Sequence, residues 1–190
     1  EREIRDFVAG KTAWLTKYMA LVPEKITFHY VTGEIHHVFG RAYPLQVCLG
    51  MREDAVVLTD GELQLVLRTK QSEREKVFKA GMKRILLWEI EKQLETWTKR
   101  MAIPESRITG VTIRVMKSRW GSCRRVTGRF SFALDLVTKP KECIEAVVVH
   151  ELCHLFAAGH GPDFYARMET YLPDYKERDR LLASLPRELV

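Results

Sequence analysis

Apolar and polar positions in the first third of the chain change from a helical pattern to a strand-like one. Residues 3–20 repeat apolar side chains at helical spacing, which predicts a first helix. Between Ile26 and Leu67, glycines separate short apolar runs, and Asp60-Gly61 lies between two of these runs as a typical hairpin turn. We therefore predict that residues 1–70 form a helix and a small, mostly antiparallel sheet.

Residues 71–190 are predicted to form a second domain that begins with a long helix. Apolar side chains recur near helical spacing over residues 72–101, and Pro104 follows this block. Ser72 and Glu75 have the spacing of a capping box, in which each side chain binds the other residue's backbone N–H. We therefore expect this helix to begin at that box and to end before the proline.

Alternating positions after the long helix predict two strands joined by a turn. Apolar and polar side chains alternate over residues 108–115 and, more regularly, over 130–136, with Thr127-Gly128 as the connecting turn. We expect the second strand to be exposed and to align a substrate. Helical patterns follow from Pro140 onward, and two shorter helices are predicted near 162–171 and 174–185.

Composition narrows the class of protein without identifying it. A chain of 190 residues with 46% hydrophobic side chains can bury a core without disulfides. The net charge of +6 favours acidic partners, although such a charge also serves solubility alone. The cysteines are far apart and form no Cys-x-x-Cys pair, which predicts reduced thiols rather than a cysteine-based zinc site: Cys48, Cys123, Cys143 and Cys153.

Neither a membrane span nor a secretion signal is evident along the chain. No apolar run approaches the roughly 20 residues that a bilayer requires. No apolar signal segment precedes the first predicted helix, so we expect a cytoplasmic protein without membrane contact. Because the chain begins at Glu1 rather than at Met, we expect the natural N-terminus to lie upstream.

The strongest chemical signal is the sequence His150-Glu151-Leu152-Cys153-His154. At about 100° per residue, the two histidines lie about 40° apart on one face of a helix and can bind the same metal ion. Glu151 flanks them and can reach a metal-bound water without binding the metal. The apolar positions on the opposite face predict that the helix is anchored in the core: Ile144, Val148, Leu152 and Leu155.

His160 is the best candidate for a third ligand. Gly159 before it suits a left-handed turn at a helix end, which would bring this histidine back toward the other two. Three imidazoles would leave the fourth position of a single Zn²⁺ open to water. We therefore predict a zinc hydroxide as nucleophile and Glu151 as the general base.

The basic run Lys117–Arg125 has two interpretations. Arg119 could stabilise an anionic transition state, and Trp120 could belong to an edge that binds substrate. Alternatively, the run is a solvated hairpin with the tryptophan in the core. Tyr165 could likewise approach the metal or serve only helix packing. We treat these three side chains as candidate substrate-binding residues.

Several separated motifs together resemble the YgjP-like family of metal-dependent hydrolases, which is related to SprT-like metallopeptidases. The resemblance is strongest over about residues 108–185 and continues more weakly back to Gly33-Glu34. It implies a zincin-like α+β fold, a zinc ion bound by the three histidines and a Ser-Arg-Trp-Gly-Ser-Cys segment near the metal. The motifs that carry it are Lys117–Cys123, Val147–Leu155, Gly159-His160-Gly161 and Leu172–Lys176.

These observations leave three functions open. The first is a zinc metallopeptidase that acts on peptides. The second keeps the metal but hydrolyses a nucleoside triphosphate or another phosphoanhydride, which the positive charge and Arg119, Arg124 and Arg125 favour. The third is a nucleic-acid-associated protease module, for which steep salt dependence of DNA binding would be evidence.

Overall fold

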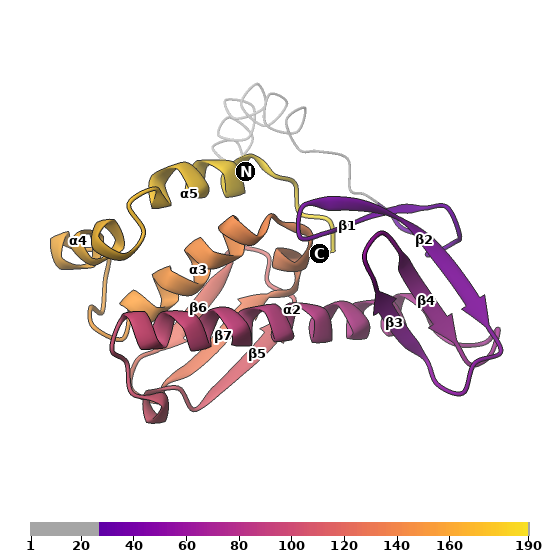
Figure 1. Cartoon of the computed structure of the whole chain (residues 1–190), viewed down its shortest axis with the longest axis horizontal. Coiled ribbons are helices and arrows are strands. Elements are labelled where there is room, and N and C mark those ends of the chain that lie inside the picture. Colours follow the sequence, from indigo (N-terminus) through magenta and orange to yellow (C-terminus); the bar gives the residue numbers. More distant parts are fainter. Residues whose placement is uncertain (1–26, 190) are drawn as a thin grey trace, which may run out of the picture.

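A long helix, α2 (Arg74–Arg100), runs along the molecule and carries two small sheets (Figure 1). The computed structural model describes residues 27–189, so the predicted helix over 3–20 lies outside the described residues. Within these residues no helix has an apolar stretch long enough to cross a bilayer. Both sheets contact α2. The predicted domain division near residue 70 therefore lies just before α2, the helix that joins the two sheets. This division stays a prediction.

The first sheet contains four strands, and its pairing is mostly antiparallel as predicted. The strands lie in the order β1-β2-β4-β3, and only the β2–β4 pair is parallel. Asp60-Gly61 forms the predicted hairpin turn between β3 and β4, where Gly61 has a φ of 106° that a side chain would strain. The strands are β1 (Ile35–Val38), β2 (Arg41–Leu49), β3 (Ala55–Leu58) and β4 (Leu63–Leu67).

The long helix was predicted correctly, but its predicted capping box was wrong. The N-cap residue is Glu73, and no side chain caps this end. The Ser72 hydroxyl instead donates to the Asp54 carboxylate at 2.9 Å. That carboxylate also accepts the backbone N–H of Arg68, so a tertiary contact at the end of the first sheet replaces the local cap.

The second sheet differs from the prediction in its strand order. Its order is β5-β7-β6, with β5 and β7 parallel and β6 and β7 antiparallel. The Thr127-Gly128 turn therefore joins β7 to β6, a strand that was not predicted, rather than to β5. The strands are β5 (Gly110–Arg114), β6 (Gly121–Arg124) and β7 (Arg129–Ala133).

The predicted strand over 130–136 is too long, and its predicted role in aligning substrate is wrong. Strand β7 ends at Ala133, and residues Leu134–Thr138 form a buried 3-10 helix, η2. The alternating pattern continues beyond the strand because Asp135 is polar although it is buried, and its carboxylate accepts backbone N–H groups from the C-terminal residues. Both edges of β7 are paired within the sheet, which leaves no free edge for a substrate strand.

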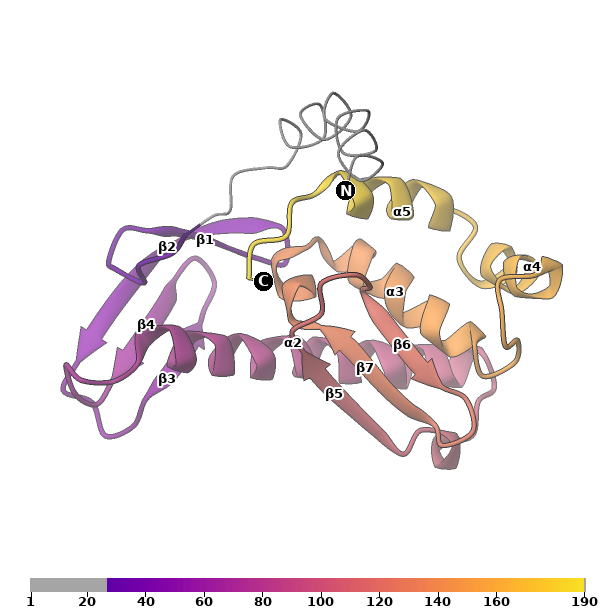
Figure 2. The ribbon, with the colours of Figure 1, turned by 180° about the vertical axis from the view of Figure 1, so that it is seen from behind.

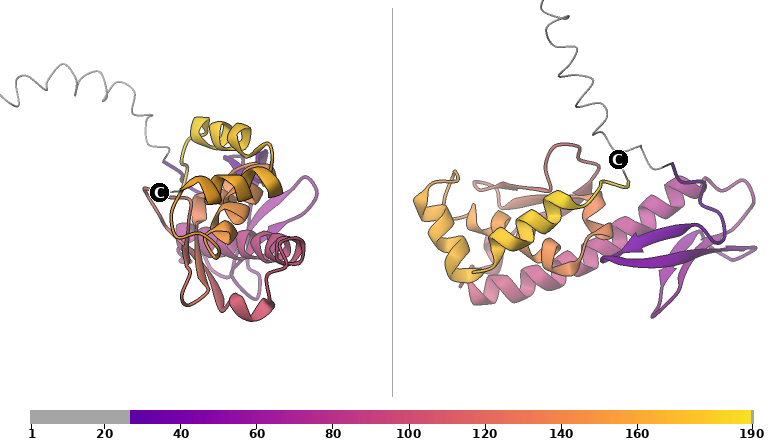
Figure 3. Two further views of the ribbon diagram at one scale, coloured as in Figure 1. Left: turned by 90° about the vertical axis from the view of Figure 1, so that its left-hand side faces the viewer. Right: turned by 90° about the horizontal axis from the view of Figure 1, so that it is seen from above.

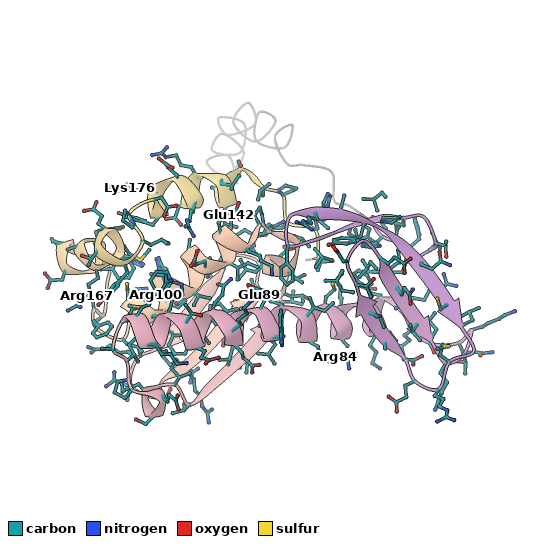
Figure 4. All side chains as sticks on the ribbon, viewed as in Figure 1. Arg84, Glu89, Arg100, Glu142, Arg167 and Lys176 are labelled. Atoms are coloured by element: carbon teal, nitrogen blue, oxygen red, sulfur yellow. The ribbon has the colours of Figure 1, made fainter. Side chains whose placement is uncertain are left out.

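Helix α3 (Lys141–Cys153) lies at the centre of the second part of the chain. It begins after Pro140, as predicted, and packs against α2, β6, α4 (Pro162–Tyr171) and α5 (Tyr175–Ser184) (Figure 3). The predicted apolar stripe, including Val148 and Leu152, is fully buried. At the start of α3, Lys141 donates to the buried Glu89 of α2 at 2.8 Å. Figure 4 labels Glu89 on α2.

The C-terminal residues connect the second sheet to the first. The buried Asp135 carboxylate accepts the backbone N–H groups of Glu188 and Leu189, at 2.9 and 2.8 Å. The Glu188 carboxylate lies 3.0 Å from the imidazole of His37 in β1. These contacts between distant parts of the chain hold its end against η2 and β1.

Candidate metal centre

Three histidines from two segments converge beside α3. His150 lies in the last turn of the helix, His154 is its C-cap, and His160 returns from the loop that follows. One nitrogen of each ring lies within 4.8 Å of the others, and they are the only described group of three or more His, Cys, Asp or Glu side chains with this spacing. The structure thus brings together all three predicted ligands, and the described part of the chain holds no cysteine site.

The surroundings of His150 and His154 favour the neutral form of these rings, which is the form that binds a metal. Burial, aided by the two neighbouring histidines, lowers the pKa of His150 to about 4. The Nδ1–H of His154 donates to the carbonyl of Ala157 at 3.2 Å, which leaves Nε2 of that ring free for a ligand. Phe164 of α4 lies beneath all three rings, with centroid distances of 4.8 Å to each, and limits their movement.

Glu151 is a buried carboxylic acid next to the histidines. Its side chain is only 5% exposed, and burial raises its pKa to about 8, although the Arg119 guanidinium acts in the opposite direction. Its Oε2 atom is buried without a hydrogen-bond partner. A buried polar atom without a partner is costly and points to a missing ligand or water. A bound dication would favour the ionised form of this carboxylate.

The burial of Glu151 predicts a pH-dependent stability of the metal-free protein. A carboxyl group with a pKa of 4.5 when unfolded and about 8 when folded binds more protons in the folded state between these values. Stability is therefore lost as pH rises through this window. Because glutamine cannot ionise, Glu151→Gln should stabilise the metal-free protein by roughly a few kcal/mol at pH 9. The stabilisation should be much smaller at pH 5.

Thermal unfolding in a chelator at pH 5, 7 and 9 measures this difference. The melting temperature of Glu151→Gln should exceed that of the unsubstituted chain most at pH 9. An equal difference in melting temperature at all three pH values would show that ionisation of Glu151 does not cause the loss of stability.

A hollow of about 590 Å³, which we call the metal-side hollow, opens over the histidines and Glu151. Arg119 and Trp120, the candidate substrate-binding residues, both line it, and Gly121 follows them at the start of β6. Trp120 is half-buried against the core, and the guanidinium of Arg187 lies over its ring, 3.7 Å from the ring centroid. Its role in substrate binding stays a prediction. The Arg187 guanidinium also donates to the carbonyl of Met116 at 2.7 Å, which anchors the segment that precedes β6.

Tyr165 is not among the side chains that line the metal-side hollow. Its exposed ring lies 6.4 Å from that of His160 and stacks on Tyr175, so its role in substrate binding stays a prediction. Sequence reasoning missed Asp179 of α5, which lines the hollow and whose pKa is raised by desolvation. One signal was available, because Asp179 shares a helical face with the buried Tyr175 and Leu182.

The solved structures that are similar to this chain include two metallopeptidase zymogens. That of Pyrococcus abyssi abylysin is 24% identical, with a TM-score of 0.45, over 53% of this chain and 99% of that one. That of Methanocaldococcus jannaschii jannalysin is 21% identical, with a TM-score of 0.44, over 50% of this chain and 93% of that one. No curated protein sequence matches the chain significantly.

The model of one protein family, described as "YgjP-like, metallopeptidase domain", matches residues 1–185. This match covers the first sheet, the histidine cluster and the segment that leads into β6. The predicted α+β class is confirmed by the two sheets and the helices around them. The chain therefore belongs to the YgjP-like metallopeptidase family.

Proposed function

We propose that the chain is a zinc-dependent peptidase in which His150, His154 and His160 hold one Zn²⁺ and Glu151 is the general base. The convergence of three imidazole nitrogens within 4.8 Å carries this proposal. Nitrogen ligands from three side chains suit a catalytic zinc site, which keeps one position open, whereas structural sites use four protein ligands. Membership of a metallopeptidase family supports the choice of a peptide substrate.

The residues present fit such an ion. His150 is neutral at physiological pH because of its lowered pKa, and the hydrogen bond of His154 sets its tautomer. When bound, zinc supplies Lewis acidity that activates water and polarises the scissile carbonyl. The unpartnered Oε2 of Glu151 accepts a proton from the attacking water, and the resulting carboxylic acid donates it to the leaving amine.

The edge of the second sheet provides a place for the peptide. Strand β6 is an edge strand that borders the metal-side hollow, and α3 contacts it. The carbonyl of Trp120 accepts a hydrogen bond from Ala133 of β7. Because backbone groups alternate sides along a strand, those of Gly121 and Cys123 face the free edge, where an extended substrate can pair.

Arginines in the metal-side hollow favour a second candidate function. Arg119 and Arg125 both line it, and neither has an ion pair within the described residues. Two free guanidinium groups near the metal suit a nucleoside triphosphate or another phosphoanhydride. The second candidate is therefore a metal-dependent pyrophosphatase that uses the same histidines and the same general base.

An assay of the zinc-loaded protein on two substrate panels tests these functions. One panel contains unfolded proteins and the other contains nucleoside triphosphates. We expect cleavage of the unfolded proteins that a chelator abolishes and that zinc restores. Turnover of nucleotides alone would contradict the peptidase proposal, and a His160→Ala variant that keeps full zinc content would contradict the proposed ligand set.

A further inference from the structure

The second sheet has an outer face that no described helix covers. Figure 2 shows β5, β7 and β6 in front of α2 and α3, which lie behind the sheet. Phe130 and Phe132 of β7 are buried on the helix side, so Arg129 and Ser131 point to the outer side. The outer face forms a second hollow of about 610 Å³, separate from the metal-side hollow but sharing part of its rim.

Strand register arranges the side chains of this face in rows across the sheet. Arg124 lies directly opposite Arg129 in one row. In the next row, Ser131 pairs with both Ser122 and Thr112, and the Thr112 and Ser131 hydroxyl oxygens are 2.9 Å apart. Arg114 and Arg119 lie at the other end of the face. We call this surface the basic face, with four exposed arginines: Arg114, Arg119, Arg124 and Arg129.

The basic face contains no acidic side chain to balance these charges. No aspartate or glutamate lines its hollow. Within residues 27–189, none of the four arginines forms a salt bridge. Like charges directly opposite each other on neighbouring strands are destabilising, so Arg124 and Arg129 have an unfavourable arrangement unless an anion lies between them.

We propose that the basic face binds the phosphate backbone of a nucleic acid without sequence preference. Guanidinium groups and hydroxyls are the side chains that commonly contact phosphates, and this face is built from both. Four residues of β7 separate the row of Arg129 from that of Arg114, a distance of about 13 Å. Measured along the axis of a duplex, this distance spans about four phosphates of one strand, at about 3.4 Å of axial rise each.

The same surface is a poor match for an acidic polypeptide. Interfaces with a polypeptide are usually centred on large anchor side chains in a pocket, whereas the centre of the basic face carries the hydroxyls of Thr112, Ser122 and Ser131. No exposed aromatic ring lines the face, because its one aromatic residue, Phe130, is 1% exposed. Without a ring for base stacking, contacts to the backbone must provide the affinity.

The basic face adjoins the metal centre. Arg119, Ser122 and Cys123 line both hollows, since β6 forms the ridge between them. A nucleic acid on the outer face would therefore lie beside any substrate paired with the free edge of β6. Binding to this face is independent of the metal, so its test does not depend on the proposed peptidase activity.

Fluorescence anisotropy with a labelled duplex of about 20 base pairs tests the proposal on the full chain in the presence of a chelator. Four phosphate contacts predict a slope of log affinity against log salt of roughly −3.6, or about a hundredfold loss between 50 and 200 mM salt. The double variant Arg124→Ser/Arg129→Ser should reduce the slope to about half and the loss to about tenfold.

A variant with the same change in net charge distinguishes the contribution of the basic face from that of the overall charge of the protein. Arg52 and Arg84 are exposed and lie on the β2–β3 loop and on α2, outside the basic face (Figure 4 labels Arg84). Arg52→Ser/Arg84→Ser should keep the salt slope of the unsubstituted chain. Equal losses in both double variants would overturn the proposal. No binding at 50 mM salt, or equal competition by a polyglutamate peptide of the same charge, would overturn it as well.

Discussion

Glu151→Gln should reduce peptidase turnover by about 10²- to 10⁴-fold while the protein keeps its full content of zinc. The substitution preserves the shape of the side chain but removes the group that accepts a proton from water. The carboxylate is buried beside the histidines, and its Oε2 has no other partner. Replacement of this carboxylate by an amide therefore affects the proton transfer and leaves the three histidine ligands in place.

Measurement of kcat together with metal analysis of the same sample checks this result. The variant should show one zinc per chain, a KM close to that of the unsubstituted protein and a greatly reduced kcat. Full activity with full zinc content would reject the role of Glu151 as general base. Loss of zinc in this variant would instead indicate that the carboxylate binds the metal.

Gly121→Ala should lower kcat by about a hundredfold, because a displacement of about 1 Å at a catalytic group has an effect of this size. A Cβ atom at residue 121 would lie only 2.5 Å from Oε1 of Glu151 and 2.8 Å from its Cγ. The backbone φ of Gly121 is not in the left-handed region, so alanine is compatible with the strand itself. The effect should therefore come from a displaced carboxylate.

Gly110→Ala provides a matched control in the same sheet. A Cβ at residue 110 of β5 would meet no atom within 4 Å, so this variant should keep both stability and activity. Gly121→Ala should retain its zinc and show the reduction mainly in kcat. A rise in KM with unchanged kcat would indicate that Gly121 contacts substrate without positioning Glu151.

Local sequence was sufficient for the helices and for the histidine pair. The boundaries of α4 were predicted at both ends. His160 does return to the other two histidines, but the left-handed turn expected at Gly159 was wrong, because the φ of Gly159 is not positive. The second sheet was predicted less well. Strand β6 is a short segment with no clear alternation, and its place beside β7 depends on pairing that its own residues do not encode.

The residues of the metal centre that come from distant elements depended on the tertiary structure. Asp179 reaches the metal-side hollow only because α5 packs against α3. Gly121 approaches Glu151 only because β6 also packs against α3. The basic face arises in the same way, since strand order places arginines from three strands and a loop on one surface. The helical spacing of Asp179 from Tyr175 and Leu182 indicates which face of α5 it shares, but no spacing along the chain indicates which distant segment that face meets.

The sequence by itself determined which residues form the candidate metal centre: two histidines one helical turn apart, a carboxylate between them and a third histidine after a glycine. This was possible because helical periodicity relates spacing along the chain to direction in space within a single element. Only the tertiary structure decided what surrounds that chemistry, including the free edge of β6 and the unpartnered Oε2 of Glu151. Pairing and packing between distant segments depend on the whole chain, because burial of the shared core selects their arrangement.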